Sequence, residues 1–477
     1  MLKRNIDKIA AFTSLRDKDG TILVRQLITL TEAKSYRIEV SELLIQAGRS
    51  LDASFVGSIE VEFFAASNLV FAFPATVINY YGEDFSSFVH TAQRVYNDFE
   101  DMQKNSQTDV PESGFNIHVD DNNEPFISLV NGPEAQEDSK IELQLFNSNG
   151  DVLEYTKSLG RLAPYQTTFL YPARELDLEV FLQHQVGACK AKFNLRWIFP
   201  RLLVGNRQKK PSAFVITHSY YDCSTAIADS NYWRPSEPDW NPASLMIPVK
   251  LEGSHFTNIY FYPIYSPSKL AVDIEIYSKE GKLLITTENV LLIVSPAQGH
   301  AVVQMREIAE NAKLLPADAF AAKVIVRPVG ESLLPARVKI ALDIGDGRGL
   351  PCNICMNLQP FNPPLALKTH SFKWLPLLSD KPGATVWLMN SSPQKNFTQT
   401  ATLELTFFRE KDNAVLKRKS ELAPNGFMVI TPDDDTELNE FLEESIGWIT
   451  IISSNAYLTT YYFSNNPSGI VGGDHGF

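Results

Sequence analysis

Three stretches of this chain carry a histidine and an aspartate just after an apolar run. They are residues 88–98 with His90, residues 214–223 with His218 and Asp222, and residues 469–477 with Asp474 and His475. An aspartate and a histidine on one loop can ligate a metal ion, or form a general base and the group that orients it. These stretches are therefore where chemistry is to be looked for first.

A structural role explains the same residues. A catalytic arrangement needs a third group, such as a nucleophilic serine or another ligand, and its position is not given by spacing. Histidine and tyrosine at a strand end can satisfy backbone groups, and a tyrosine corner is a recurrent device of β-sandwiches. Recurrence favours this role because one active site rarely needs duplication, although a repeated ligand site would recur too. We assign no catalytic residue and no metal ligand from the sequence.

Aromatic residues follow the second of these stretches at a short distance. Flat rings stack on sugars, and protein interfaces also favour tyrosine, tryptophan and arginine. Packing between modules is the alternative, because Trp233 and Trp240 bracket a proline-rich linker. For a ligand, we predict a site at this place, since loops on rigid scaffolds favour binding. Its residues are His218, Tyr220, Asp222, Tyr232 and Trp233.

Acidic clusters and a cysteine pair provide weaker signals. The acidic clusters are residues 120–124, 343–349 and 433–437, whose oxygens would suit calcium although none matches an EF-hand loop. The third is also typical of a helix N-terminus. Cys352 and Cys355 form a CxxC pair without the second pair or the histidines of a zinc site, which indicates packing thiols. We expect no cofactor, with calcium as the alternative.

Two landmarks recur along the chain with one period. Turn-forming pairs stand at Asp19-Gly20, Gly150-Asp151, Glu280-Gly281 and Asp412-Asn413, about 130 positions apart. A glycine opens an apolar strand at Gly57, Gly187 and Gly447, separated by 130 and 260 positions. Such self-similarity is typical of an array of like units.

Each unit has the pattern of a β-sandwich. Apolar residues alternate with polar ones in runs such as 141–146, 271–277 and 401–407, which is the period of half-buried strands. The turn pairs favour tight two-residue hairpins with positive φ. We predict an all-β tandem array of about four β-sandwich modules, and we expect the entry strand of the first to be short or missing. The modules span residues 1–108, 109–240, 241–362 and 363–477.

The order of these features resembles a known kind of module. A strand, a turn pair, a strand, a proline turn such as Leu162-Ala-Pro164 or Leu422-Ala-Pro424, and a glycine-opened strand follow one another. This order is similar to the immunoglobulin-like β-sandwich modules strung along bacterial surface and secreted proteins. The resemblance implies spacer, adhesive or carbohydrate-binding roles, and it transfers no individual residue.

Charge and hydropathy limit the kinds of partner that we expect this protein to bind. The formal charge of −13 argues against nucleic acid and against an anionic membrane surface. No apolar run is long enough to span a membrane. The basic N-terminus lacks the apolar stretch of a signal peptide. We therefore expect a cytoplasmic protein, or an exported one whose leader was removed.

Two functional hypotheses fit these observations. The first is a non-enzymatic structural or binding protein of repeated modules, with a carbohydrate or another protein as its partner, because no nucleotide fingerprint or nucleophile elbow is present. The alternative is a glycan-active or metal-dependent enzyme with its site at a module end.

Overall fold

The computed structural model shows an all-β protein with 54% strand and 9% helix, which confirms the predicted fold class. Neighbouring strands in its sheets run antiparallel. The structure describes residues 8–66, 76–91, 93–95, 107–111, 114–199, 201–219, 233–263, 266, 268–294, 300–314, 319–330, 333–335, 338–381 and 383–476.

Four segments follow one another along the chain. The first segment, residues 8–95, contains β1 (Ile9–Asp17), β2 (Ile22–Leu30), α1 (Val40–Gln46), β3 (Gly57–Ala65), β4 (Ile78–Tyr81), β5 (Ser86–Val89) and β6 (Arg94–Val95). The second, residues 107–219, contains β7 (Gln107–Pro111), β8 (Phe115–Ile117), β9 (Asn123–Val130), β10 (Gln136–Phe146), β11 (Val152–Leu162), β12 (Thr167–Leu170), η1 (Pro172–Arg174), α3 (Leu178–Leu182), β13 (Gly187–Arg196), β14 (Ile198–Phe199), β15 (Leu203–Gln208) and β16 (Ala213–His218).

The other two segments have a similar make-up. The third, residues 233–358, contains β17 (Trp233–Pro235), β18 (Ala243–Val249), β19 (Phe256–Phe261), β20 (Lys269–Tyr277), β21 (Leu283–Ile293), β22 (Ala301–Gln304), α4 (Met305–Asn311), β23 (Phe320–Val329), β24 (Leu333–Pro335), β25 (Lys339–Gly345) and β26 (Cys352–Asn357). The fourth, residues 363–476, contains α5 (Pro363–Ala366), β27 (Ser371–Leu378), β28 (Thr385–Met389), β29 (Ala401–Arg409), β30 (Val415–Leu422), β31 (Phe427–Ile430), η3 (Pro432–Asp434), α6 (Thr436–Leu442), β32 (Ile446–Ser453), β33 (Thr459–Asn465) and β34 (Val471–His475).

The second, third and fourth segments share one strand order. Each has an outer sheet whose strands lie in the same order: β11-β10-β13-β7, β21-β20-β23-β18 and β30-β29-β32-β27. Each also has an inner sheet, β12-β9-β15-β16, β22-β19-β25-β26 and β31-β28-β33-β34. The described part of the first segment has a sheet β2-β1-β3 and a hairpin β4-β5. The module boundaries given above stay a prediction.

Alternation of side chains explains why these runs form packed strands. In β10, Ile141, Leu143 and Leu145 are buried while Gln144 is exposed. Because successive side chains of a strand point to opposite faces, one face of the sheet is apolar and must be covered. The buried faces form large apolar cores, one in the second segment, one in the fourth and one that extends from the third into the fourth.

The predicted hairpin at Gly150 exists, but its loop is longer than two residues. Gly150 has the expected positive φ of 86°. Its N–H donates to Asn147 O at 3.2 Å, and the Asn147 N–H donates to Asp151 O at 3.2 Å. The loop therefore has three residues, a turn followed by a glycine in the left-handed region. Gly20 and Gly281 have the same arrangement, with φ of 88° and 81°.

Two of these hairpins contact the proline turn of the next segment. A Cβ on Gly20 would lie 2.1 Å from Pro164 O, and one on Gly281 would lie 2.1 Å from Pro424 O. A Cβ on Gly150 would meet nothing within 4 Å. The sequence landmarks thus mark contacts from the first segment to the second and from the third to the fourth.

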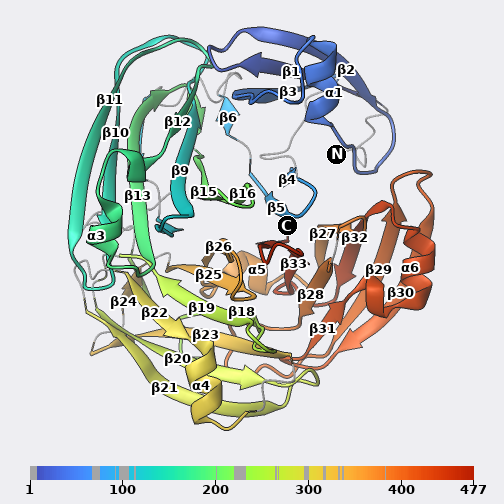
Figure 1. Ribbon diagram of the computed structural model, residues 1–477. Helices are drawn as coiled ribbons and strands as arrows, with labels where there is room; N and C mark the ends of the chain where they lie inside the picture. The colour runs from blue at the N-terminus through green and yellow to red at the C-terminus, as the bar shows by residue number, and fades with distance from the viewer. Residues whose placement is uncertain are drawn as a thin grey trace.

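The segments follow one another around a centre, where the second strand of the β4–β5 hairpin and the last strand of each inner sheet lie (Figure 1). These strands are β5, β16, β26 and β34, and each contacts the next, with β34 contacting β5. Near their first residues, an apolar cluster takes side chains from all four segments, Phe85, Ala213, Val215, Leu350 and Ile470. The C-terminus therefore lies at the centre of the molecule.

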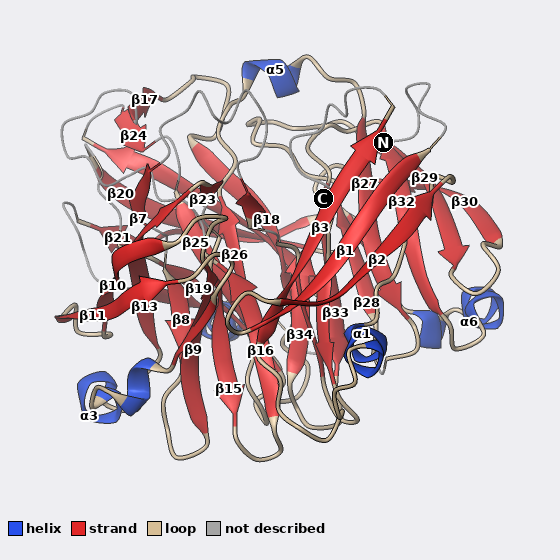
Figure 2. Ribbon diagram, turned by 90° about the horizontal axis from the view of Figure 1, so that it is seen from above, coloured by secondary structure: helices blue, strands red, loops and turns tan. Residues whose placement is uncertain are grey.

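Short helices lie at the edges of the sheets. Figure 2 shows α1, α3 and α6 along one side of the molecule and α5 on the opposite side. The helices α3, α4 and α6 have the same place in chain order, between an inner-sheet strand and an outer-sheet strand. Among the described residues, we find no helix with the length and apolar character needed to cross a membrane.

Candidate metal centre

Three histidines far apart in sequence meet at the centre of the molecule. His90 directly follows β5, His218 ends β16 and His475 ends β34. Each offers a ring nitrogen, and these nitrogens all lie within 4.8 Å of one another. The His90 ring centroid is 4.7 Å from that of His218 and 4.2 Å from that of His475, both edge to face. This cluster is the candidate functional site.

Strand register explains why these residues meet. In each inner sheet, one residue of the second strand pairs with one of the third strand, which pairs with one of the last strand. The equivalent series are Ile127–Val204–Thr217, Ile259–Leu342–Ile354 and Val386–Tyr462–Asp474. The residue after each series is His218, Cys355 or His475. Because the last strands surround one centre, equivalent positions from different segments come together there.

Each of the three rings has a hydrogen-bonding oxygen near Nδ1. His90 Nδ1 lies 2.7 Å from Asp474 Oδ2, His218 Nδ1 lies 3.0 Å from Ser219 O, and His475 Nδ1 lies 3.1 Å from Gly476 O. Carboxylate and carbonyl oxygens accept hydrogen bonds, so the network assigns the proton to Nδ1 in His90 and His475. In that tautomer Nε2 is the metal-binding atom.

Asp474 organises the cluster. Its Oδ2 also accepts from the His90 backbone N–H at 2.7 Å, and its Oδ1 accepts from the His475 N–H at 2.8 Å. The carboxylate is 6% exposed. Burial alone would raise the pKa of Asp474, but the charge and hydrogen bond of His90 outweigh it and hold this pKa well below its usual range. A fixed negative charge therefore lies beside the three imidazoles.

Two of the histidines are held neutral. Burial, and then the charges of His90 and Arg201, lower the pKa of His218 well below its usual value. Burial, followed by the charge of His90, lowers the pKa of His475 to about 4. Arg201 Nη1 lies 3.3 Å from His218 Nδ1, so the positive charge of the arginine opposes protonation of this ring. Neutral imidazole is the form that binds a metal ion.

The third segment has a thiol at the equivalent position. Cys355 Sγ donates to Gly114 O at 3.5 Å and lies 3.8 Å from Tyr262 Oη. Burial raises the pKa of Cys355 to about 11 and that of Cys352 to about 12. Both cysteines lie inside β26, not at the strand-to-helix turn of a redox motif. Their contacts are those of packing thiols.

The predicted ligand site overlaps this centre at one residue. His218 belongs to it, whereas Trp233 begins β17, where it pairs with Pro335. Tyr220, Asp222 and Tyr232 lie outside the described residues. Sequence reasoning identified the histidines but not their convergence. The available signal was their recurrence after the closing strand of several units.

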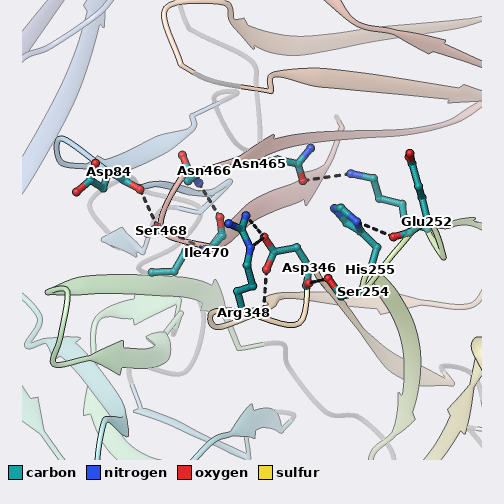
Figure 3. Close-up of polar contacts among 11 residues, drawn as sticks. Asp84, Glu252, Ser254, His255, Asp346, Arg348, Asn465, Asn466, Ser468 and Ile470 are labelled. Carbon is teal, nitrogen blue, oxygen red and sulfur yellow. Dashed lines mark hydrogen bonds and ion pairs between the residues drawn. The ribbon is translucent and has the colours of Figure 1, made fainter.

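Two of the acidic clusters examined for calcium make protein contacts. Asp120 Oδ1 accepts from the N–H groups of Asn122 and Asn123 at 2.7 and 2.8 Å. Asp346 forms an ion pair with Arg348, shown in Figure 3. The third cluster supplies the N-cap of α6, where Asp435 accepts from Leu438 N at 3.0 Å, which confirms the helix interpretation.

Comparison with known proteins gives no family. No protein-family model matches the chain, and no curated protein matches it significantly. The site is therefore interpreted from its own geometry.

Proposed function

We propose that this protein is a non-enzymatic structural or binding protein of four immunoglobulin-like β-sandwich units, tied together at their centre by one transition-metal ion. The observation that carries the proposal is the convergence of His90, His218 and His475, whose ring nitrogens lie within 4.8 Å of one another. A carbohydrate or protein partner, as expected from the sequence, belongs to the same proposal.

The donor set favours zinc or a similar ion. Imidazole nitrogen suits zinc, copper and nickel, whereas calcium and magnesium prefer oxygen ligands. The hydrogen bond from His90 Nδ1 to Asp474 Oδ2 is the carboxylate–histidine pairing that orients a metal-binding ring. Asp474 also supplies a negative charge that offsets part of the charge of a divalent cation.

Burial favours a structural role for the ion. His218 is 1% exposed, and the His90 side chain is 13% exposed. A catalytic metal site must keep a position open to substrate. However, three histidines also form the protein ligands of some catalytic zinc sites. This donor set is the observation that keeps a metal-dependent enzyme as the second candidate.

Metal analysis of the purified full chain tests the proposal. We expect elemental mass spectrometry to find one equivalent of zinc per chain. Replacement of zinc by Co²⁺ should give the visible absorption spectrum of a nitrogen-ligated cobalt ion. His218→Ala and His475→Ala should each weaken metal binding by at least about 100-fold. His184→Ala is the matched control, because its side chain is 75% exposed.

The measurements distinguish a structural metal site from a catalytic one. Absence of metal uptake, or equal uptake by His218→Ala and the control, would overturn the proposal. A Co²⁺ spectrum that changes on addition of azide would show an exchangeable position and favour the enzyme. A spectrum that azide leaves unchanged would support the closed structural site.

A further inference from the structure

We infer that the metal ion closes the molecule by holding the β4–β5 hairpin of the first segment against the second and fourth segments. The inference rests on the proposed function. It adds that binding of the metal ion at this site controls docking of the hairpin. His90 is the residue that the first segment contributes, and it lies directly after β5.

The third and fourth segments are joined by extensive apolar packing. One core combines side chains of both, among them Ile259, Leu342, Trp387 and Tyr461. The Tyr461 hydroxyl also donates to Met246 O at 2.8 Å inside this interface. Such a buried apolar interface behaves as part of one core and has no need of a metal.

The second and third segments are joined by both apolar and polar groups. Phe146 and Ala188 pack against Tyr260, Tyr262, Ala341 and Cys355. Beside them, Asp343 Oδ1 accepts from Asn116 Nδ2 at 2.9 Å and from Asn353 Nδ2 at 2.8 Å. All three of these polar side chains are buried, so hydrogen bonds as well as apolar packing join the two segments.

The β4–β5 hairpin is held at the centre by hydrogen bonds and single apolar side chains, and one of these bonds runs from Ile216 N–H to Ser87 Oγ at 3.1 Å. Ser86 O accepts from Ser464 Oγ at 3.1 Å and from Asn466 Nδ2 at 3.2 Å. Ser468 Oγ donates to Asp84 O at 2.7 Å, as Figure 3 shows. The apolar anchors in the described part of β5 are Phe88, in the core of the fourth segment, and Val89. Hydrogen bonds of this kind each contribute only about 1 kcal/mol.

His90 extends this contact to both neighbours. Its backbone N–H and its Nδ1 both bind Asp474 Oδ2 of the fourth segment, at 2.7 Å each. A cation shared with His218 and His475 would bind the same ring to the second and fourth segments at once. Imidazole rings alone attract one another weakly, whereas a divalent ion would bind all three. The ion thus couples its own binding to docking of the hairpin.

Hydrogen exchange of the full chain measures this coupling. Amide exchange is followed by mass spectrometry in the zinc-loaded protein, after chelation, and after zinc is restored. We expect exchange in residues 78–90 to become at least about tenfold faster without zinc and to recover with it. Residues 269–293, which form β20 and β21, should keep their protection and serve as the internal reference.

Variants distinguish a failure of the inference from a failure of the metal proposal. His218→Gln should lose the response to zinc, and the exposed His184→Ala should keep it. Metal content is measured on the same samples. A protein that binds one zinc at these histidines but shows equal exchange in residues 78–90 with and without it would overturn the inference alone. A protein that takes up no zinc would overturn both.

Discussion

Alanine substitutions at two hairpin glycines should separate backbone strain from a clash between segments. Gly150 and Gly281 have nearly the same φ, 86° and 81°. Alanine in this left-handed region costs roughly 1–2 kcal/mol relative to glycine. A Cβ on Gly150 meets nothing within 4 Å, so Gly150→Ala should lower the free energy of unfolding by that amount alone.

Gly281→Ala adds a steric term. Its Cβ would lie 2.1 Å from Pro424 O and 2.9 Å from Gly426 N, both backbone atoms of the next segment. The contact must open, and overpacking of this kind typically costs about 1–3 kcal/mol. It would also strain the neighbouring hydrogen bond from Phe427 N to Lys279 O, 3.1 Å long. We expect a total loss of roughly 2–5 kcal/mol.

Urea unfolding of the two variants beside the wild type provides the measurement. Gly20→Ala is a second test, since its Cβ would lie 2.1 Å from Pro164 O, and it should behave like Gly281→Ala. Equal losses for Gly150→Ala and Gly281→Ala would refute the reasoning, because they would show that the hairpin does not press on the next segment.

Three further predictions concern the centre and the cores. Asp474→Asn should weaken zinc binding about 10–100-fold in a chelator competition, because the charged acceptor of His90 Nδ1–H is lost; unchanged affinity would contradict this. Asn390→Ala should lower the free energy of unfolding by about 1–3 kcal/mol, because buried carbonyls and the Asn455 amide lose their partner; a change near zero in the urea midpoint would exclude this role. Burial lowers the pKa of Lys250 to about 8, below its unfolded value of about 10.4, so stability should rise as pH increases between these values. Lys250→Met should raise the melting temperature at pH 7 and remove that rise, and a wild-type pH profile in the variant would show the reasoning to be wrong.

The strands were predictable because their signal is local. The alternation of Ile141, Leu143 and Leu145 with polar residues needs no knowledge of what covers the face. The turn at Gly150 was predictable for the same reason, since positive φ is a property of the residue itself. Loop length was predicted wrongly because the partner of Asn147 is Asp151, and pairing across a turn depends on the register of both strands.

Contacts between segments could not be predicted from local pattern. The sequence placed Gly20 and Pro164 in successive units, but nothing in their spacing indicated that they touch. The same holds for His90 and Asp474, which are 384 positions apart and share two hydrogen bonds. Such pairs depend on how whole sheets pack, and the free energy of that packing is spread over many side chains.

The recurrence of histidine at the ends of the modules is interpreted differently when the segments surround a common centre. In a linear array, a histidine repeated at each module end is most simply structural, because the copies stay apart. Around a common centre, equivalent positions converge, and one ligand from each segment is enough to build a metal site. The positions occupied by His218 and His475 meet in this way, and Cys355 at the equivalent position faces Gly114 and Tyr262 instead. The departure of the third segment from the pattern leaves three imidazoles at the centre, one from each of the other segments.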